Sequence, residues 1–222
     1  MRDWNSLYQQ NPTPDEGSFF KREWFKRFHL SDQPDTRKYL STDYAVSEGK
    51  GDFTEFGVFG VDAGDNLYAL DWYHDQSTTD VWIEQLLDMV RDHKPLTTYG
   101  EKGVIQKSIE PILNKRSQER KVYGHFEWIA RTANKAAMAQ SFRSRAASGK
   151  VFIPFGDWGD RLINQLCTFP AGKHDDAVDV CALMGLVLDE IIGSSPKQQE
   201  TNRKTNDYHT EINEGFDECR VL

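Results

Sequence analysis

The order of strand-like and helix-like segments limits the folds that this chain can adopt. Three β-branched and aromatic runs follow one another at 38–45, 53–61 and 66–73, and the turn-forming segment 62–66 joins the last two. Runs of this kind separated by such a turn predict antiparallel strands. Helical and extended patterns then alternate along the chain, which is typical of parallel crossover connections. We therefore expect an α/β protein with a mixed central β-sheet flanked by helices.

The remaining elements are predicted from apolar spacing and from turn residues. Helices are expected at 79–94, 104–115, 134–147, 158–166 and 174–193, and short strands at 96–100, 122–129 and 151–154. The aromatic lead-in 1–37 is expected to form a short helix or an arm that packs its Phe and Trp side chains on a neighbouring surface. Residues 194–222 are polar and lack periodicity, which predicts a mobile tail after one domain at 38–193.

Charge is distributed unevenly along the chain. The net charge is -8, yet residues 102–150 hold eleven Lys and Arg against three Asp and Glu. This pattern fits a protein whose carboxylates hold metal while a separate face meets phosphates, or one with a merely solvated basic helical face. Three cysteines without paired spacing indicate neither a disulfide framework nor a thiolate zinc site. No apolar run reaches membrane-spanning length, and the N-terminus is not signal-like, so we expect a cytoplasmic protein without a membrane partner.

Several acids occur where the local pattern does not need them. Asp43 lies inside the first predicted strand, Glu101 ends the fourth, and Asp175 and Asp176 open the last helix, with Asp179 one turn on. Each has a plain structural explanation: Asp43 could face solvent on an edge strand, Glu101 could open a loop, and Asp175 or Asp176 could cap the helix.

Together the acids suggest a metal site. In a right-handed crossover sheet the first and fourth predicted strands can lie side by side, which places Asp43 near Glu101 and lets the last helix bring Asp176 against them. Such a trio repels itself without metal, and carboxylate oxygens favour Mg²⁺ or Mn²⁺. Two such ions, about 3.5–4 Å apart, activate water and stabilise the leaving 3′-oxygen in phosphodiester hydrolysis. No His-Glu-x-x-His, Gly-x-Ser-x-Gly or Walker A motif offers a competing site.

Several short motifs occur in the order found in one known family. They are Phe19–Phe28, Ser41-Thr42-Asp43, Gly51-Asp52-Phe53-Thr54, Tyr99–Gly103, the basic segment from Asn134-Lys135 to Gly149-Lys150-Val151, and Phe169–Asp179, the most specific of them. On these motifs, residues 17–192 resemble the C-terminal nuclease domain of the large terminase subunit of tailed bacteriophages.

The resemblance implies an RNase H-like fold and a metal-dependent endonuclease that cuts concatemeric viral DNA during genome packaging by two-metal-ion hydrolysis with Mg²⁺ or Mn²⁺. Its metal-binding acids fall on Asp43, Glu101 and Asp176, with Asp175 as a further ligand or supporting group. His174 would orient an acid or touch phosphate, or it could be a helix-terminal histidine bonded to backbone. The residues that match the basic DNA-facing helix of the family are Lys135, Arg143 and Arg145.

The same resemblance implies partners: double-stranded DNA, the portal protein, the small terminase subunit and a packaging ATPase domain, in the host cytoplasm. No nucleotide-binding motif occurs in the sequence, so we expect the ATPase either to have been removed or to be a separate chain. Two alternatives stay open. One is another RNase H-like nuclease, such as a resolvase or transposase core, and the other is a mainly non-catalytic docking module for portal or motor. We expect Asp179 to support the helix or a basic partner, Lys135 or Arg143, rather than to bind metal.

Overall fold

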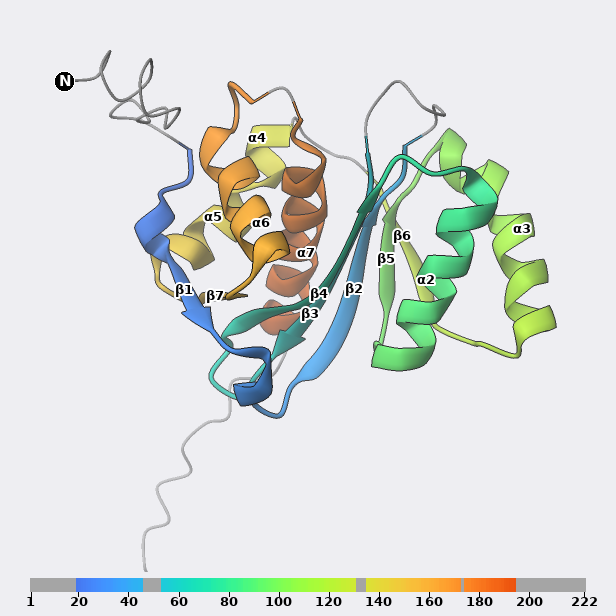
Figure 1. Ribbon diagram of the computed structural model, residues 1–222, viewed down its shortest axis with the longest axis horizontal. Helices are drawn as coiled ribbons and strands as arrows, with labels where there is room; N and C mark the ends of the chain where they lie inside the picture. The colour runs from blue at the N-terminus through green and yellow to red at the C-terminus, as the bar shows by residue number, and fades with distance from the viewer. Residues whose placement is uncertain (1–18, 46–52, 131–134, 173, 195–222) are drawn as a thin grey trace, which may run out of the picture.

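A mixed β-sheet forms the centre of the computed structural model, which describes residues 19–45, 53–130, 135–172 and 174–194 (Figure 1). Within these ranges seven strands are arranged in the order β1-β7-β4-β3-β2-β5-β6. They are β1 (Phe25–Phe28), β2 (Arg37–Asp43), β3 (Thr54–Val61), β4 (Leu67–Asp75), β5 (Thr98–Glu101), β6 (Phe126–Ile129) and β7 (Val151–Pro154). Strands β2, β3 and β4 pair antiparallel, and the other neighbours pair parallel. The predicted mixed sheet is confirmed.

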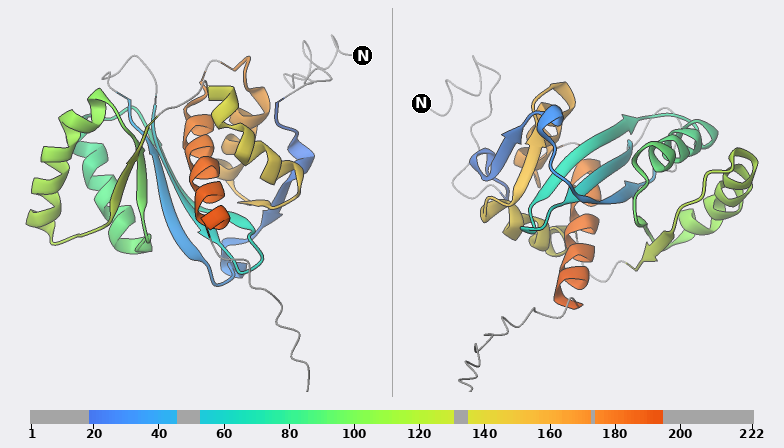
Figure 2. Two further views of the ribbon diagram at one scale, coloured as in Figure 1. Left: turned by 180° about the vertical axis from the view of Figure 1, so that it is seen from behind. Right: turned by 90° about the horizontal axis from the view of Figure 1, so that it is seen from below.

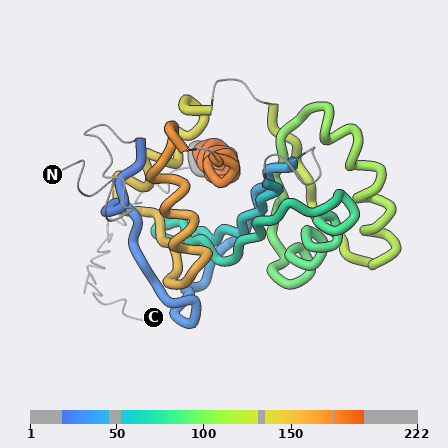
Figure 3. The backbone as a smooth tube through the Cα atoms, turned by 45° about the horizontal axis from the view of Figure 1, so that its top comes forward, coloured from blue at the N-terminus to red at the C-terminus, as the bar shows by residue number. Residues whose placement is uncertain are grey.

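Helices cover both faces of this sheet (Figures 1 and 2). Helices α2 (Thr79–His93) and α3 (Val104–Arg120) lie on one face, and on the other lie α4 (Lys135–Met138), α5 (Gln140–Ala147), α6 (Asp157–Thr168) and α7 (Asp176–Ser194). Each face has its own cluster of buried apolar side chains. Figure 3 shows α7 almost end-on beside the sheet. Among the described residues, no helix has both the length and the apolar character needed to cross a membrane.

The two helical layers explain why the central strand β3 contains an almost continuous apolar run. All eight of its residues are buried, because side chains that point to either face meet a helix. Residues that alternate between the two faces along such a strand cannot be assigned to a face from the sequence, since both faces are apolar.

The aromatic lead-in contributes a strand that was not predicted. After the short 3₁₀ helix η1 (Arg22–Trp24), β1 pairs in parallel with β7, and a second 3₁₀ helix, η2 (Leu30–Asp32), follows. The expected aromatic packing is confirmed, because the fully buried Phe20 contacts the rings of Phe25 and Phe142. Four residues without clear alternation carry too little pattern to identify a strand.

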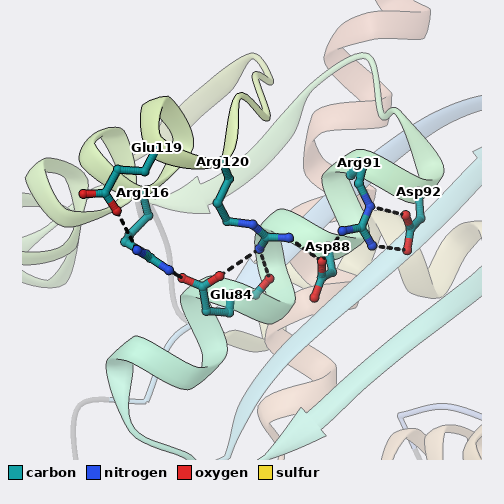
Figure 4. Close-up of polar contacts among 7 residues, drawn as sticks. All are labelled: Glu84, Asp88, Arg91, Asp92, Arg116, Glu119 and Arg120. Atoms are coloured by element: carbon teal, nitrogen blue, oxygen red, sulfur yellow. Dashed lines mark hydrogen bonds and ion pairs between the residues drawn. The ribbon is translucent and has the colours of Figure 1, made fainter.

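Two predicted helices differ from those observed. The helix expected at 134–147 is interrupted at Ala139 into α4 and α5, and Asn134 lies outside the described residues. The helix expected to end near Lys115 continues to Arg120. Its last turns are held by ion pairs to α2, including one of 2.5 Å between Arg120 Nη2 and Asp88 Oδ1 (Figure 4). Residues 51 and 52 of the family-like turn, Lys173, and residues 195–222 of the predicted tail also fall outside the described ranges.

Helices α5 and α7 approach each other closely at Gly185. A Cβ atom added there would lie 2.6 Å from the backbone nitrogen of Phe142. Alanine is ordinarily the better helix former, but here we expect Gly185→Ala to lower the free energy of unfolding by about 1–3 kcal/mol, because backbone atoms must move apart. Urea unfolding measures the loss. Gly103→Ala, where an added Cβ meets nothing within 4 Å, is the control, and an equal effect in both variants would contradict the explanation.

Candidate metal centre

Asp43 and Glu101 lie at the C-terminal ends of two adjacent parallel strands. The register of β2 and β5 pairs Leu40 with Thr98 and Ser41 with Tyr99. Each acid follows its register pair by two residues, so the two acids lie opposite each other and on the same face. That face is covered by α7, since Ser41 Oγ donates a hydrogen bond of 2.9 Å to the carbonyl oxygen of Val180. The predicted adjacency of these two strands is confirmed.

The first turn of α7 brings further carboxylates to the same place. Asp176 begins the helix with 4% of its surface exposed, and Asp179 lies one turn on. The pKa of Asp43 is raised well above its usual range, first by burial and then by the negative charges of Asp179 and Asp176, while Lys135 opposes the shift and Glu101 adds to it. The structure therefore places Asp176, Asp179 and Glu101 near enough to Asp43 to raise its pKa.

Lys135 lies within this acidic cluster. Its Nζ atom is 2.7 Å from Asp175 Oδ1 and 2.7 Å from Asp179 Oδ2. Partial burial lowers the pKa of Lys135, but the hydrogen bonds to the two carboxylates outweigh it, so the net shift is upward. The expected pairing of Asp179 with a basic partner is thus confirmed for Lys135. A direct contact between Lys135 and DNA stays a prediction, and it would have to compete with both aspartates.

The two predicted DNA-binding arginines make contacts within the protein. Arg143 Nε donates a hydrogen bond of 2.7 Å to the carbonyl oxygen of Phe19, and its guanidinium lies over the rings of Phe19 and Trp24. Arg145 makes a longer contact, with 3.5 Å between its Nη2 atom and Asp189 Oδ1, and its side chain is 12% exposed. These contacts tie α5 to its neighbours, and a role of either arginine on DNA stays a prediction.

His174 lies just before the acidic start of α7. Its ring meets the ring of Phe53 edge to face, with centroids 5.2 Å apart, and its Nδ1 atom is buried without a hydrogen-bond partner among the described residues. The alternative of a ring nitrogen bonded to backbone is therefore not seen for Nδ1. A role of His174 toward an acid or phosphate stays a prediction.

An open pocket of about 260 Å³ gives access to two of the acids. It is lined by Thr42, Asp43, Tyr44, Glu101, Lys102, Gly103, Val104 and Ile105. The carboxyl ends of β2 and β5 thus lie at a pocket whose wall includes the start of α3.

The donor set fits a hard divalent cation, although its atoms do not form a finished cage. In the described parts of the chain, no group of three or more His, Cys, Asp and Glu side chains is arranged to hold a metal ion as it stands. The candidate ligands Asp43, Glu101 and Asp176 nevertheless offer only carboxylate oxygens, which suit Mg²⁺ and Mn²⁺. Asp175 is held by Lys135 and would have to leave it to bind a cation.

The sequence interpretation missed one buried acid in the same region. Glu55 of β3 pairs in register with Asp43 and is fully buried. One of its carboxyl oxygens accepts a hydrogen bond of 2.6 Å from Trp72 Nε1, and the other forms a hydrogen bond of 2.7 Å with His74 Nδ1. The available signal was a glutamate inside an otherwise apolar strand, which is rarely buried without a specific partner.

We expect Lys135→Met to destabilise the metal-free protein by about 1–3 kcal/mol, because two partly buried carboxylates lose their counter-charge. The loss should be smaller than for a fully buried pair, since the side chain of Asp175 is 38% exposed. Mn²⁺ should restore more stability in the variant than in the wild type, because the cation replaces the missing positive charge. Thermal melts in EDTA and in Mn²⁺ measure both effects. Lys115→Met, which breaks the exposed 3.9 Å contact with Glu119, is the control, and an equal loss there would contradict the prediction.

The comparisons with known proteins concern the fold. No protein-family model and no curated protein sequence matches the chain. Among solved structures, the large terminase nuclease of thermophilic phage G20c with bound magnesium is 14% identical, covers 78% of this chain and 98% of its own, and has a TM-score of 0.56. The large terminase nuclease domain of Thermus phage P74-26 is 11% identical, with 76% and 93% covered and a TM-score of 0.54.

A third match is the nuclease domain of the large terminase subunit gp2 of bacterial virus Sf6. It is 8% identical, covers 77% of this chain and 98% of its own, and has a TM-score of 0.55. At such identities the likeness establishes the arrangement of helices and strands and leaves the activity to be argued from the site. The chain has the RNase H-like fold of the large terminase nuclease domains.

Proposed function

We propose that this protein is a divalent-metal-dependent endonuclease that hydrolyses phosphodiester bonds of double-stranded DNA. The observation that carries the proposal is the convergence of Asp43, Glu101 and Asp176 from two adjacent strand ends and a helix start. Solved structures with this fold support a cation, since the G20c nuclease was obtained with magnesium, zinc and cobalt, and the Sf6 domain with manganese.

The three acids would act by holding and orienting the cations, Mg²⁺ or Mn²⁺, with two ions proposed. When bound, these ions supply Lewis-acid stabilisation of charge on the phosphate and a nucleophilic water. Asp43 has a raised pKa in the metal-free protein, so a proton competes with the cation for its carboxylate. Lys135 would keep Asp175 and Asp179 paired and so leave Asp43, Glu101 and Asp176 as the ligands.

We further propose that the substrate is concatemeric viral DNA cut during genome packaging, with portal protein, small terminase subunit and packaging ATPase domain as partners. The shared fold with phage terminase nucleases supports this role. A resolvase or transposase core would instead prefer branched or end-specific DNA over linear duplex. A docking module would bind a portal ring equally well after Asp43→Asn and would show negligible cleavage.

Supercoiled plasmid incubated with Mg²⁺ or Mn²⁺ tests the activity. We expect nicked and linear products with either ion and none in EDTA. Glu101→Gln should lower the cleavage rate by at least about a hundredfold, because changes even in groups that only support a metal ligand cost about 10–100-fold in activity. Glu110→Gln on α3 is the control for the loss of one carboxylate. Intact plasmid with both ions at high protein concentration would count against a nuclease.

A further inference from the structure

A row of polar side chains crosses the sheet beside the candidate metal centre. Register pairs join Asp43 of β2 to Glu55 of β3, and Glu55 to His74 of β4. Residues directly opposite each other in antiparallel strands point to the same face. All three side chains therefore lie on the face that α7 covers, and the row leads from the metal centre to His74.

Glu55 fixes the orientation of His74. The Glu55 side chain is fully buried, and one of its oxygens forms a hydrogen bond of 2.7 Å with His74 Nδ1. Trp72 Nε1 donates to the other oxygen at 2.6 Å. Burying an acid in this way is rarely needed for stability, since an apolar residue of similar size often serves as well. Its place in the row of Asp43 indicates a role in the site.

Phe53 links this pair to the start of α7. Its ring is stacked on His74, with centroids 4.0 Å apart and planes 13° apart, and it meets His174 edge to face at 5.2 Å. The ring of His174 therefore rests against a ring that is itself stacked on a histidine hydrogen-bonded to Glu55.

His174 connects the two sides of this arrangement. It directly precedes Asp175 and Asp176, and it also lines an open hollow of about 560 Å³ along α6, together with Asn164, Gln165 and Thr168. The same residue therefore belongs both to the segment that opens α7 and to the lining of this hollow.

We propose that Glu55, His74 and Phe53 are positioning residues that hold His174 at the candidate metal centre, and that they act on catalysis through His174. The catalytic part rests on the proposed nuclease function. The positioning part concerns only the described contacts and can be tested without any cleavage.

A double-mutant cycle tests the catalytic part. Phe53→Leu keeps an apolar side chain but removes the stacked ring, and we expect it to lower kcat by about tenfold, as for other groups that orient active-site residues. In a His174→Ala background, Phe53→Leu should change kcat less than twofold, while Phe53→Tyr should retain wild-type kcat in the native background. A merely structural role predicts the same factor in both backgrounds, and that result would overturn the proposal.

Nuclear magnetic resonance of the metal-free protein at one fixed pH tests the positioning part. The ring signals of His174 should move in Phe53→Leu, which removes the ring that His174 contacts, and in His74→Gln, which removes the ring on which Phe53 is stacked. His93→Gln is the matched control. It breaks a similar pair, 2.8 Å from His93 Nε2 to Asp71 Oδ2, and should leave both the His174 signals and cleavage unchanged.

The two proposals fail in different ways. Unmoved His174 signals in Phe53→Leu and His74→Gln would overturn the positioning role whatever the activity. If the signals move in these variants but the wild-type protein cuts no DNA, the nuclease function is overturned and the positioning role stands.

Discussion

Asp43→Asn should reduce metal-dependent DNA cleavage by at least about a hundredfold while the protein stays folded. Asp43 offers a half-buried carboxylate next to Glu101 and near the start of α7, and asparagine has nearly the same shape but binds a hard cation poorly. Plasmid cleavage in Mn²⁺ measures the loss. Asp71→Asn, an acid of β4 paired with His93 away from the pocket, is the control. Cleavage near the wild-type rate in Asp43→Asn would remove this residue from the site.

The same substitution should stabilise the metal-free protein at neutral pH. Burial and negative neighbours raise the pKa of Asp43 in the folded state, so the folded state binds this proton more tightly than the unfolded state does. Stability of the wild type therefore falls as pH rises from the ordinary pKa of an aspartate, about 3.9, through the raised folded value, and the penalty is complete above it. Asparagine carries no such penalty.

Thermal melts in EDTA at pH 5 and pH 8 measure this effect. The difference in Tm between Asp43→Asn and wild type should be larger at pH 8, and each 1 kcal/mol corresponds to about 2–4 °C in a protein of this size. Comparing the two proteins at each pH removes the contributions of the other acids. A variant that is less stable than wild type at pH 8 in EDTA would contradict the electrostatic account of the cluster.

Asp176→Asn and Asp179→Asn should have different effects, although both residues lie in the first turns of α7. Asp176 is nearly buried and is a proposed ligand, so we expect losses of at least about a hundredfold in cleavage and tenfold in Mn²⁺ affinity. Asp179 is held 2.7 Å from Lys135, and its replacement should leave cleavage within about tenfold of wild type.

Isothermal titration with Mn²⁺ and plasmid cleavage, run on both variants, separate the two acids. If Asp179→Asn abolished cleavage and Asp176→Asn did not, the roles assigned to the two acids would be reversed.

The acids of the candidate centre could be predicted because their signals are local. A carboxylate at a strand end or at the start of an apolar helix is visible in the sequence, and crossover connections make adjacent parallel strands an expected outcome. Together these signals identified Asp43, Glu101 and Asp176 before their spatial arrangement was known. Their roles as metal ligands stay predictions.

The supporting residues could not be predicted in the same way. Glu55 and His74 face each other only because of the register of β3 and β4, which a sequence pattern does not fix in strands buried on both faces. The pairing of Lys135 depends on how α4 packs beside α7, and its basic neighbours instead suggested a surface that faces DNA. Strand β1 was missed because only pairing with β7 identifies it.

Anomalous diffraction from crystals soaked in Mn²⁺ tests the central claim most directly. The account predicts manganese density within about 2.0–2.3 Å of carboxylate oxygens of Asp43, Glu101 and Asp176. Soaks of Asp43→Asn crystals should show weaker density or none. Manganese bound elsewhere, with no density at any of the three acids in a protein that cuts DNA, would contradict the claim.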